Sequence, residues 1–293
     1  MKEPIFKGSG VALITPFEDE GINYKKLEEL LEFQLKNGTD AIVICGTTGE
    51  ASAMSEDEHM KVLEFCIEKM RGKTKMLAGT GSNNIDKAVR LSRYAEKLRY
   101  DGVLVVTPYY NKATQKGLIE YYGTIAKTIK IPIVLYNVPS RTGVSISLDT
   151  LKILDESYPN IIGVKEASGD VAFAAKIKAA TNLIVYSGND DVTIPIMAAG
   201  GDGVISVVGN IFPDAVHRFC KDFIDGNIDL ARERFLAMLE IMDAMFIEVN
   251  PIPVKTAMNL IGFDVGELRL PLCEMEEVNV EKLKTVLKKY GRL

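Results

Sequence analysis

The chain has little of the histidine chemistry on which many hydrolases and metalloenzymes depend. Only two of its 293 residues are histidines, His59 and His217, and neither has a partner at metal-ligand spacing. A metal site is therefore not expected. A Ser-His-Asp hydrolase is disfavoured too, because His217 would have to act from the middle of an amphipathic helix. No GxGxxG sequence follows the first apolar run, so nothing indicates a bound dinucleotide and we expect no cofactor.

Clusters of positive charge and long apolar stretches are also missing. The formal net charge is -5 and no long Lys/Arg cluster occurs, so there is no electrostatic footprint for nucleic acid or an anionic membrane surface. No stretch reaches the roughly 18 apolar residues that span a bilayer. The first residues, Met1–Phe6, lack the apolar core of a signal peptide. We expect a cytoplasmic protein that acts on small molecules and has neither nucleic acid nor membrane as a partner.

Cysteine is too sparse to provide a disulfide framework. The residues are far apart in the sequence and form no CxxC pair, and most have apolar neighbours. We expect reduced core residues at all of these positions, which are Cys45, Cys66, Cys220 and Cys273.

Strand-like and helix-like segments alternate along the chain, at intervals of about thirty residues. The short apolar runs expected to be strands are Val11 to Thr15, Ala41 to Gly46, Met76 to Gly79, Gly102 to Thr107, Ile133 to Asn137, Ile161 to Lys165, Leu183 to Ser187 and Gly203 to Val207. Amphipathic stretches expected to be helices include Asn23 to Asn37, Ser55 to Arg71, Asn84 to Arg99, Gln115 to Ile129, Pro213 to Asp225, Asp229 to Val249, Pro253 to Leu260 and Asn279 to Tyr290.

This alternation predicts an α/β protein with a closed (β/α)8 TIM barrel. A doubly wound sheet would usually have fewer strands and a glycine fingerprint after the first one. We expect the barrel to occupy residues 1–225 as the catalytic domain. Residues 226–293 would form a C-terminal helical region.

One apolar run, Ile161 to Ser168, contains a lysine near its end. The run is too short for a helix and is typical of a buried parallel strand. Alternation along such a strand places Gly163 and Lys165 on one face, so the amine would look into an apolar layer with space beside it. Burial favours the neutral amine, which is a nucleophile toward ketones. The plain alternative is a lysine at a strand end whose ammonium reaches solvent.

Hydroxyls, phenols and one guanidinium follow other predicted strands. In TIM barrels the chemistry takes place at the carboxyl ends of the strands, where all of these side chains would meet. Each also has a plain alternative as a turn residue, a rim tyrosine or a solvated loop arginine. The residues concerned are Thr47, Thr48, Tyr109, Tyr110, Tyr136 and Arg141.

Taken together, these motifs resemble those of the dihydrodipicolinate synthase family, within the pyruvate-dependent class I aldolases that include N-acetylneuraminate lyase. The resemblance extends over essentially the whole chain. The matching segments are Gly46-Thr47-Thr48-Gly49-Glu50, Thr107-Pro108-Tyr109-Tyr110-Asn111, Tyr136-Asn137-Val138-Pro139-Ser140-Arg141-Thr142-Gly143, Gly163-Val164-Lys165-Glu166-Ala167-Ser168-Gly169, Ser187-Gly188-Asn189-Asp190 and Asn250-Pro251-Ile252-Pro253-Val254-Lys255.

The resemblance implies a lyase that condenses pyruvate with L-aspartate 4-semialdehyde in diaminopimelate and lysine biosynthesis. It implies that Lys165 forms the Schiff base with pyruvate and that Tyr136 relays protons. It further implies that Thr47 links Tyr136 to Tyr110, which would come from the adjacent subunit of a homotetramer built as a dimer of dimers.

Substrate-binding roles are implied in the same way. Thr47 and Thr48 would hold the pyruvate carboxylate, and Arg141 would meet the carboxylate of aspartate semialdehyde. Gly188 and Ile205 would line the pocket. Lys255, at the end of the last matching segment, is given no catalytic role, and the prolines before it are expected to start a helix.

Two alternatives stay open. One is a related 2-keto acid aldolase or lyase with the same lysine and a longer substrate, although Arg141 suits a short acid better than a sugar chain. Turnover of aspartate semialdehyde compared with N-acetylneuraminate distinguishes the two. The other is a non-catalytic barrel that binds pyruvate, which would show binding without turnover.

The resemblance also leads to a prediction about feedback control. Members of the family often bind lysine as an inhibitor at a subunit interface, and His59, Asn83 and Tyr109 fit that pattern. Glu56 and Lys87 do not, because lysine-sensitive members have a histidine and a glutamate there, and Lys87 would repel the amines of the ligand. We predict weak or absent inhibition in a lysine titration of turnover. Strong inhibition at sub-millimolar lysine would refute this.

Overall fold

The computed structural model describes residues 2–19 and 21–293, and within them eight strands close into a barrel. Neighbours follow the order β1-β10-β9-β8-β7-β6-β5-β4, and the pairs run parallel, as between β7, β8 and β9. The predicted TIM barrel with C-terminal helices is therefore confirmed. The barrel strands are β1 (Gly8–Ala12), β4 (Ala41–Ile44), β5 (Lys75–Gly79), β6 (Gly102–Val106), β7 (Ile133–Asn137), β8 (Ile161–Glu166), β9 (Ile184–Ser187) and β10 (Gly203–Ser206).

Helices follow the barrel strands, and β2 (Phe17–Glu18) pairs antiparallel with β3 (Gly21–Ile22) after β1. The α-helices are α1 (Tyr24–Lys36), α2 (Glu56–Met70), α3 (Ile85–Lys97), α4 (Gln115–Thr128), α5 (Pro139–Thr142), α6 (Leu148–Ser157), α7 (Val171–Ala180), α8 (Thr193–Ala198), α9 (Pro213–Ile224), α10 (Ile228–Leu236), α11 (Leu239–Ala244), α12 (Ile252–Leu260) and α13 (Glu277–Lys289). Short 3-10 turns are η1 (Ala51–Ala53), η2 (Asp190–Val192) and η3 (Val208–Asn210).

The internal contacts of the chain group into two compact units. The first comprises the residues up to Gly8 together with Lys75–Ile205. The second comprises Ser9–Thr74 and Ser206–Leu293.

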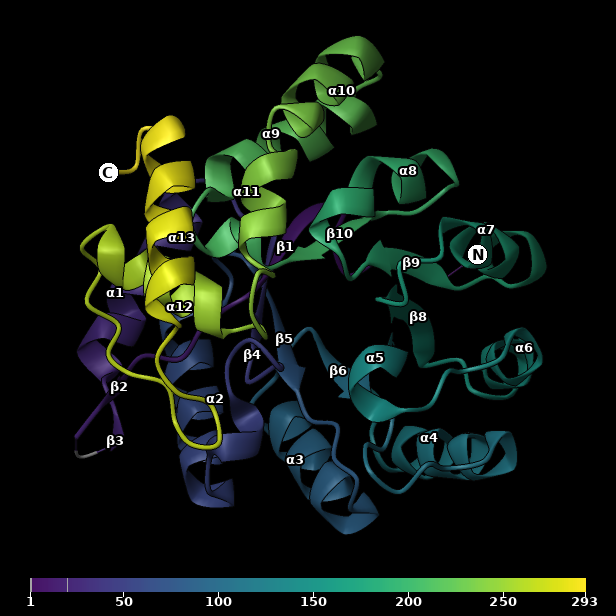
Figure 1. Ribbon diagram of the computed structural model, residues 1–293. Helices are drawn as coiled ribbons and strands as arrows, with labels where there is room; N and C mark the ends of the chain where they lie inside the picture. The colour runs from purple at the N-terminus through teal and green to yellow at the C-terminus, as the bar shows by residue number, and fades with distance from the viewer. Residues whose placement is uncertain (1, 20) are drawn as a thin grey trace. The chain divides into compact units, whose positions relative to one another are not determined.

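In the first unit, α3, α4, α6 and α7 pack against one another in chain order, and α3, α6 and α7 also contact β6, β8 and β9 (Figure 1). The N-terminal segment is attached to this unit by Phe6, which stacks on Tyr186 of β9 with ring centroids 4.3 Å apart. The Tyr186 hydroxyl donates to the Phe6 carbonyl at 2.8 Å. Lys2 pairs with Asp155 at 2.6 Å.

In the second unit, α1 packs on α2, α9 on α10, and both α11 and α12 on α13 (Figure 1). Ser55 caps α2 in a reciprocal capping box, in which its hydroxyl accepts the Glu58 N–H and the Glu58 carboxylate accepts the Ser55 N–H. Asn23 caps α1 in the same sense, through the N–H of Lys26. The predicted helices begin at these capping residues, Asn23 and Ser55, and each predicted start therefore lies one residue before the observed one.

Two predicted elements differ more clearly. The first strand is Gly8–Ala12 rather than Val11 to Thr15, because the ladder to β4 pairs Gly10 with Ala41 and the preceding glycines carry no apolar signal. The segment Asp229 to Val249 is not one helix, since α10 and α11 are separated at Ala237–Met238. There the Met238 N–H bonds to the Phe235 carbonyl in a tighter turn, and no glycine or proline marks the break.

The cysteine prediction holds at three positions. Cys45, Cys66 and Cys220 are buried free thiols, and burial raises the pKa of the Cys45 and Cys66 thiols. Cys273 is exposed, so the expectation of a core residue was wrong there. It lies in the segment between α12 and α13, which has no regular structure to bury it.

Two kinds of feature are absent from the residues that the structure describes. Within residues 2–19 and 21–293, no group of three or more His, Cys, Asp or Glu side chains is placed to hold a metal ion. No helix in this part of the chain combines the length and apolar character needed to cross a membrane.

The His217–Asp40 pair generates a prediction about pH and stability. His217 Nδ1 lies 3.1 Å from Asp40 Oδ2, and this hydrogen bond raises the pKa of His217 against the opposing effect of burial. Because the folded pKa is raised, the stabilisation is fully present below the unfolded value of about 6.5 and is lost as pH rises through the folded pKa. His217→Gln should therefore lower the free energy of unfolding by up to about 1 kcal/mol in acidic buffer and by much less in alkaline buffer.

Urea unfolding of the wild type and His217→Gln at about pH 6 and about pH 9 measures this difference. A loss of equal size at both values would contradict the charged pair.

Candidate active site

Lys165 lies near the end of β8, buried beside Tyr136 of β7. The two residues are in register across the parallel ladder, and Lys165 Nζ is 4.5 Å from the centroid of the Tyr136 ring. Lys165 is 4% exposed, so the rim alternative, with the ammonium in solvent, is not what the structure shows. A buried amine and a buried phenol are thus held side by side, an arrangement that suits a reaction through a lysine Schiff base.

The sequence predicts open space beside Lys165 at Gly163, but the structure shows close packing there. A Cβ atom at Gly163 would lie 2.8 Å from the Ile184 carbonyl oxygen and 3.0 Å from the Ile184 Cβ. The missing side chain allows β9 to approach β8 closely, and it is this approach that the glycine serves.

The side chains of Asn137 and Glu166, which directly follow Tyr136 and Lys165, join the ends of the same two strands. Asn137 Nδ2 donates to Glu166 Oε2 at 2.8 Å, while the side-chain oxygen Asn137 Oδ1 accepts the Ile146 N–H at 3.0 Å. Glu166 Oε1 accepts the Ser168 N–H at 2.7 Å. Burial raises the pKa of Glu166, and these donors act against that rise. Asn137 and Glu166 therefore fix the chain directly after Tyr136 and Lys165.

Arg141 is presented on α5, a single helical turn that begins directly after β7. Pro139 occupies the first turn, and Gly143 ends it in a left-handed conformation with φ 68°. The buried Thr107, which follows β6, donates to the Thr142 hydroxyl at 3.0 Å. This contact ties α5 to the end of β6 and leaves Arg141 exposed at the carboxyl end of the barrel strands.

Tyr110 lies in a turn rather than in an extended segment. Its φ is 71°, and the Asn111 N–H bonds back to the Tyr109 carbonyl at 2.9 Å, so the chain turns here. Tyr110 is 91% exposed, while Tyr109 is only partly so. A phenol so fully presented outward is available to another chain.

Gly188 and Ile205, which the resemblance expects to line the pocket, both lie in closely packed surroundings. The Gly188 N–H bonds to the Glu166 carbonyl at 2.7 Å, and a Cβ there would lie 2.4 Å from that of Ala167. Only glycine fits this position. Ile205 is fully buried on β10.

The two threonines lie in the second unit, in the turn after β4. Thr48 is 3% exposed, and its hydroxyl accepts a hydrogen bond from Asn250 Nδ2 at 2.9 Å. A hydroxyl that accepts this bond can still donate its own O–H. Thr47 is partly exposed, and its carbonyl accepts the Glu50 N–H at 3.0 Å, which closes the turn.

The structure thus brings together Lys165 with Tyr136, and Thr48 with Asn250. That the two groups converge on one ligand stays a prediction. The supporting roles of Asn137, Glu166 and Asn250 were missed, although all three lie in the matching motifs. A polar residue inside an otherwise apolar or motif segment is the signal that would have found them.

Known proteins similar to this chain agree with the resemblance that its motifs indicate. Residues 5–290 match the model of the dihydrodipicolinate synthetase family. The chain is 52% identical to the 4-hydroxy-tetrahydrodipicolinate synthase of Thermoanaerobacter sp. strain X514, covering 99% of this chain and 98% of the relative, and 52% identical to that of Acetivibrio thermocellus, covering 99% of each. The crystal structure of dihydrodipicolinate synthase from Aquifex aeolicus superposes with a TM-score of 0.96 at 45% identity, covering 98% of both chains.

Proposed function

Since the chain belongs to the dihydrodipicolinate synthetase family, we propose that Lys165 is the amine that forms the Schiff base with pyruvate. The protein catalyses the 4-hydroxy-tetrahydrodipicolinate synthase reaction, in which pyruvate condenses with L-aspartate 4-semialdehyde on the route to diaminopimelate and lysine. It is a lyase. The observation that carries the assignment to Lys165 is its burial at the end of β8 beside the Tyr136 ring.

The proposed chemistry begins at the Lys165 nitrogen. It attacks the ketone carbon of pyruvate, and loss of water leaves an iminium whose positive nitrogen acidifies the neighbouring methyl group. Removal of a methyl proton gives an enamine, whose carbon attacks the aldehyde of the second substrate. The aldehyde oxygen then takes up a proton, and the amine of the semialdehyde attacks the iminium carbon, which closes the ring and releases the Lys165 amine. Tyr136 is the proposed relay for these protons, being the phenol adjacent to the amine.

The proposed binding roles are those that the family resemblance implies, and the positions of the polar groups support them. Thr48, whose hydroxyl is oriented by Asn250, and Thr47 in the same turn are proposed to hold the pyruvate carboxylate. Arg141 on α5 is proposed to bind the semialdehyde carboxylate, for which a guanidinium fork is well suited. Gly188 and Ile205 are proposed to line the pocket.

An oligomer is part of the proposal. Tyr110 is 91% exposed, and we assign it to the active site of a neighbouring subunit, where Thr47 would link it to Tyr136. The assembly proposed is a homotetramer, built as a dimer of dimers. A cytoplasmic location also stays a proposal, as does the division into a catalytic barrel over residues 1–225 and a helical region over 226–293.

Reduction with borohydride in the presence of pyruvate tests the Schiff base. We expect a covalent adduct on Lys165, located by mass mapping, and a loss of turnover of about three orders of magnitude or more in Lys165→Ala. Lys176→Ala on α7, an exposed lysine, is the matched control and should keep both adduct and turnover. Wild-type speed in Lys165→Ala, or an adduct on another lysine, would refute the assignment.

Tyr110→Phe tests the intersubunit relay, and turnover should fall by about tenfold or more. Mixing unfolded Tyr110→Phe and Lys165→Ala chains and refolding them together should restore activity, because one site of a mixed pair then has both native residues. The recovery expected is up to about one quarter of wild type for random pairing. Activity that stays at the level of the separate variants would place Tyr110 outside the partner's site.

A further inference from the structure

The second unit contains a buried ion pair that the mechanism above does not use. Lys255 Nζ lies 2.8 Å from Glu50 Oε1, and the two side chains are only 1% and 2% exposed. Glu50 ends the turn that carries Thr47 and Thr48, and Lys255 lies in α12. The attraction in such a pair is largely offset by the cost of removing both charges from water, so net stability is a poor explanation for its presence.

The Glu50 carboxylate is held at both oxygens. Besides the contact from Lys255 to Oε1, the Arg269 N–H donates to Oε2 at 3.0 Å. The Glu50 backbone has φ 53°, a left-handed conformation that is uncommon for a residue with a side chain and persists where its surroundings fix it. These contacts therefore fix the direction of the Glu50 side chain and, with it, the conformation of the Glu50 backbone.

The turn before Glu50 depends on this fixed conformation. The Glu50 N–H closes the turn onto the Thr47 carbonyl at 3.0 Å, and the Thr15 hydroxyl donates to the Gly49 carbonyl at 2.8 Å. Asn250 holds the Thr48 hydroxyl at 2.9 Å. Thr47 is held on its C-terminal side by the Glu50 N–H, so a shift of the Glu50 carboxylate and its backbone is passed on to Thr47.

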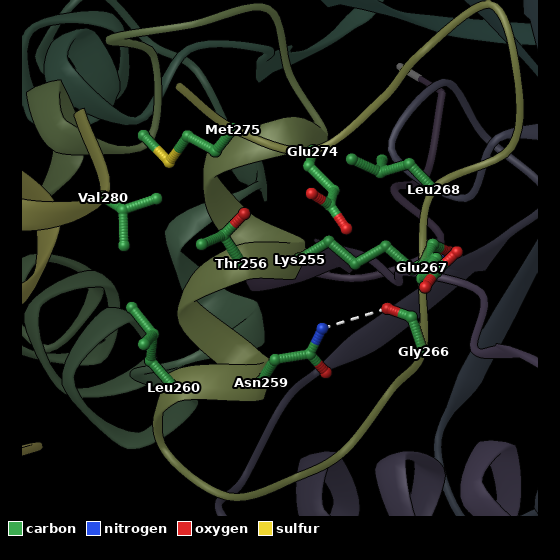
Figure 2. Close-up of a pocket in the computed structure, with 10 residues that line it drawn as sticks. All are labelled: Lys255, Thr256, Asn259, Leu260, Gly266, Glu267, Leu268, Glu274, Met275 and Val280. Atoms are coloured by element: carbon green, nitrogen blue, oxygen red, sulfur yellow. Dashed lines mark hydrogen bonds between the residues drawn. The ribbon is translucent and has the colours of Figure 1, made fainter. Parts of the chain in front are cut away.

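Lys255 is in turn fixed from its other side. Its ammonium also donates to the Glu267 carbonyl at 2.6 Å and lies 4.1 Å from the Phe17 ring centroid. Figure 2 shows the Lys255 side chain extending from α12 toward the segment of Gly266–Leu268, along the wall of a cavity of about 380 Å³. Next to a cavity, apolar packing constrains the chain less, so these polar contacts determine where the ammonium lies.

We propose that Lys255 is a positioning residue for the condensation: through Glu50 it fixes the Gly46–Glu50 turn, so that the two threonine hydroxyls meet the pyruvate carboxylate. This rests on the proposed function, in which those hydroxyls bind that carboxylate. Lys255 itself touches neither substrate in this assignment.

The test removes the pair without leaving a buried charge. In Glu50→Gln/Lys255→Met, both side chains are neutral and of similar length, and the glutamine oxygen can still accept the Arg269 N–H. The control Glu28→Gln/Lys69→Met removes the same two charges from a surface pair of the same unit, where N and O are 2.6 Å apart. Thermal unfolding, the fraction of chains trapped by saturating pyruvate and borohydride, and full kinetics are measured for each.

For the buried double variant we expect the KM for pyruvate to rise about 10- to 100-fold, while the KM for aspartate semialdehyde changes by less than about threefold. A merely structural role would lower the trapped fraction and the apparent kcat and leave the pyruvate KM unchanged. A pyruvate KM equal to that of wild type in folded double variant would therefore overturn the proposal.

Lys255→Arg provides a second variant if the double variant does not fold. It keeps the charge but replaces the compact ammonium by a planar fork, so the Glu50 carboxylate must shift. A raised pyruvate KM is expected, and an unchanged one overturns the proposal. Failure of the wild type to be trapped at Lys165 would instead refute the proposed function, so the two failures are distinguishable.

Discussion

The parallel register of β7, β8 and β9 is the constraint from which the placement of the reactive groups follows. It sets Tyr136 opposite Lys165, and Lys165 opposite Tyr186, at one level of the ladder. Gly163 allows the close approach of β9 that this register needs. One strand slipped by a residue would turn Lys165 to the opposite face, so the backbone ladder itself selects which side chain meets the phenol.

Polar contacts just beyond the strands hold the segments that follow them in place. Asn137 and Glu166 join the ends of β7 and β8, and Thr107 attaches α5 to β6. In the second unit, Asn250 and the Glu50–Lys255 pair act on the turn after β4. All of these groups are buried and hydrogen-bonded, which is the condition under which buried polar side chains specify one geometry.

Much of this was predictable from the sequence, for local reasons. Apolar runs with helical stretches between them predicted the barrel, and Ile133–Asn137 was predicted to the residue because an apolar and aromatic run leads directly up to Asn137. The lysine at the end of β8 and the motifs after β4 and β7 were recognised from composition and resemblance. The boundary of β1 was not, since Gly10 belongs to a strand only through its pairing with Ala41 of β4. The turn at Tyr110 and the break at Met238 likewise have no local signal, and the pairing of Glu50 with Lys255 joins residues far apart in the chain.

The attachment of Phe6 to Tyr186 has a practical consequence for labelling and immobilisation. Tyr186 stands next to Lys165 in the ladder, and its ring and hydroxyl are both engaged by Phe6, so a bulky fusion crowding the first few residues disturbs the strand neighbouring the reactive amine. The opposite terminus ends after α13 with Leu293 exposed. Affinity handles, fluorophores and surface tethers are best placed there.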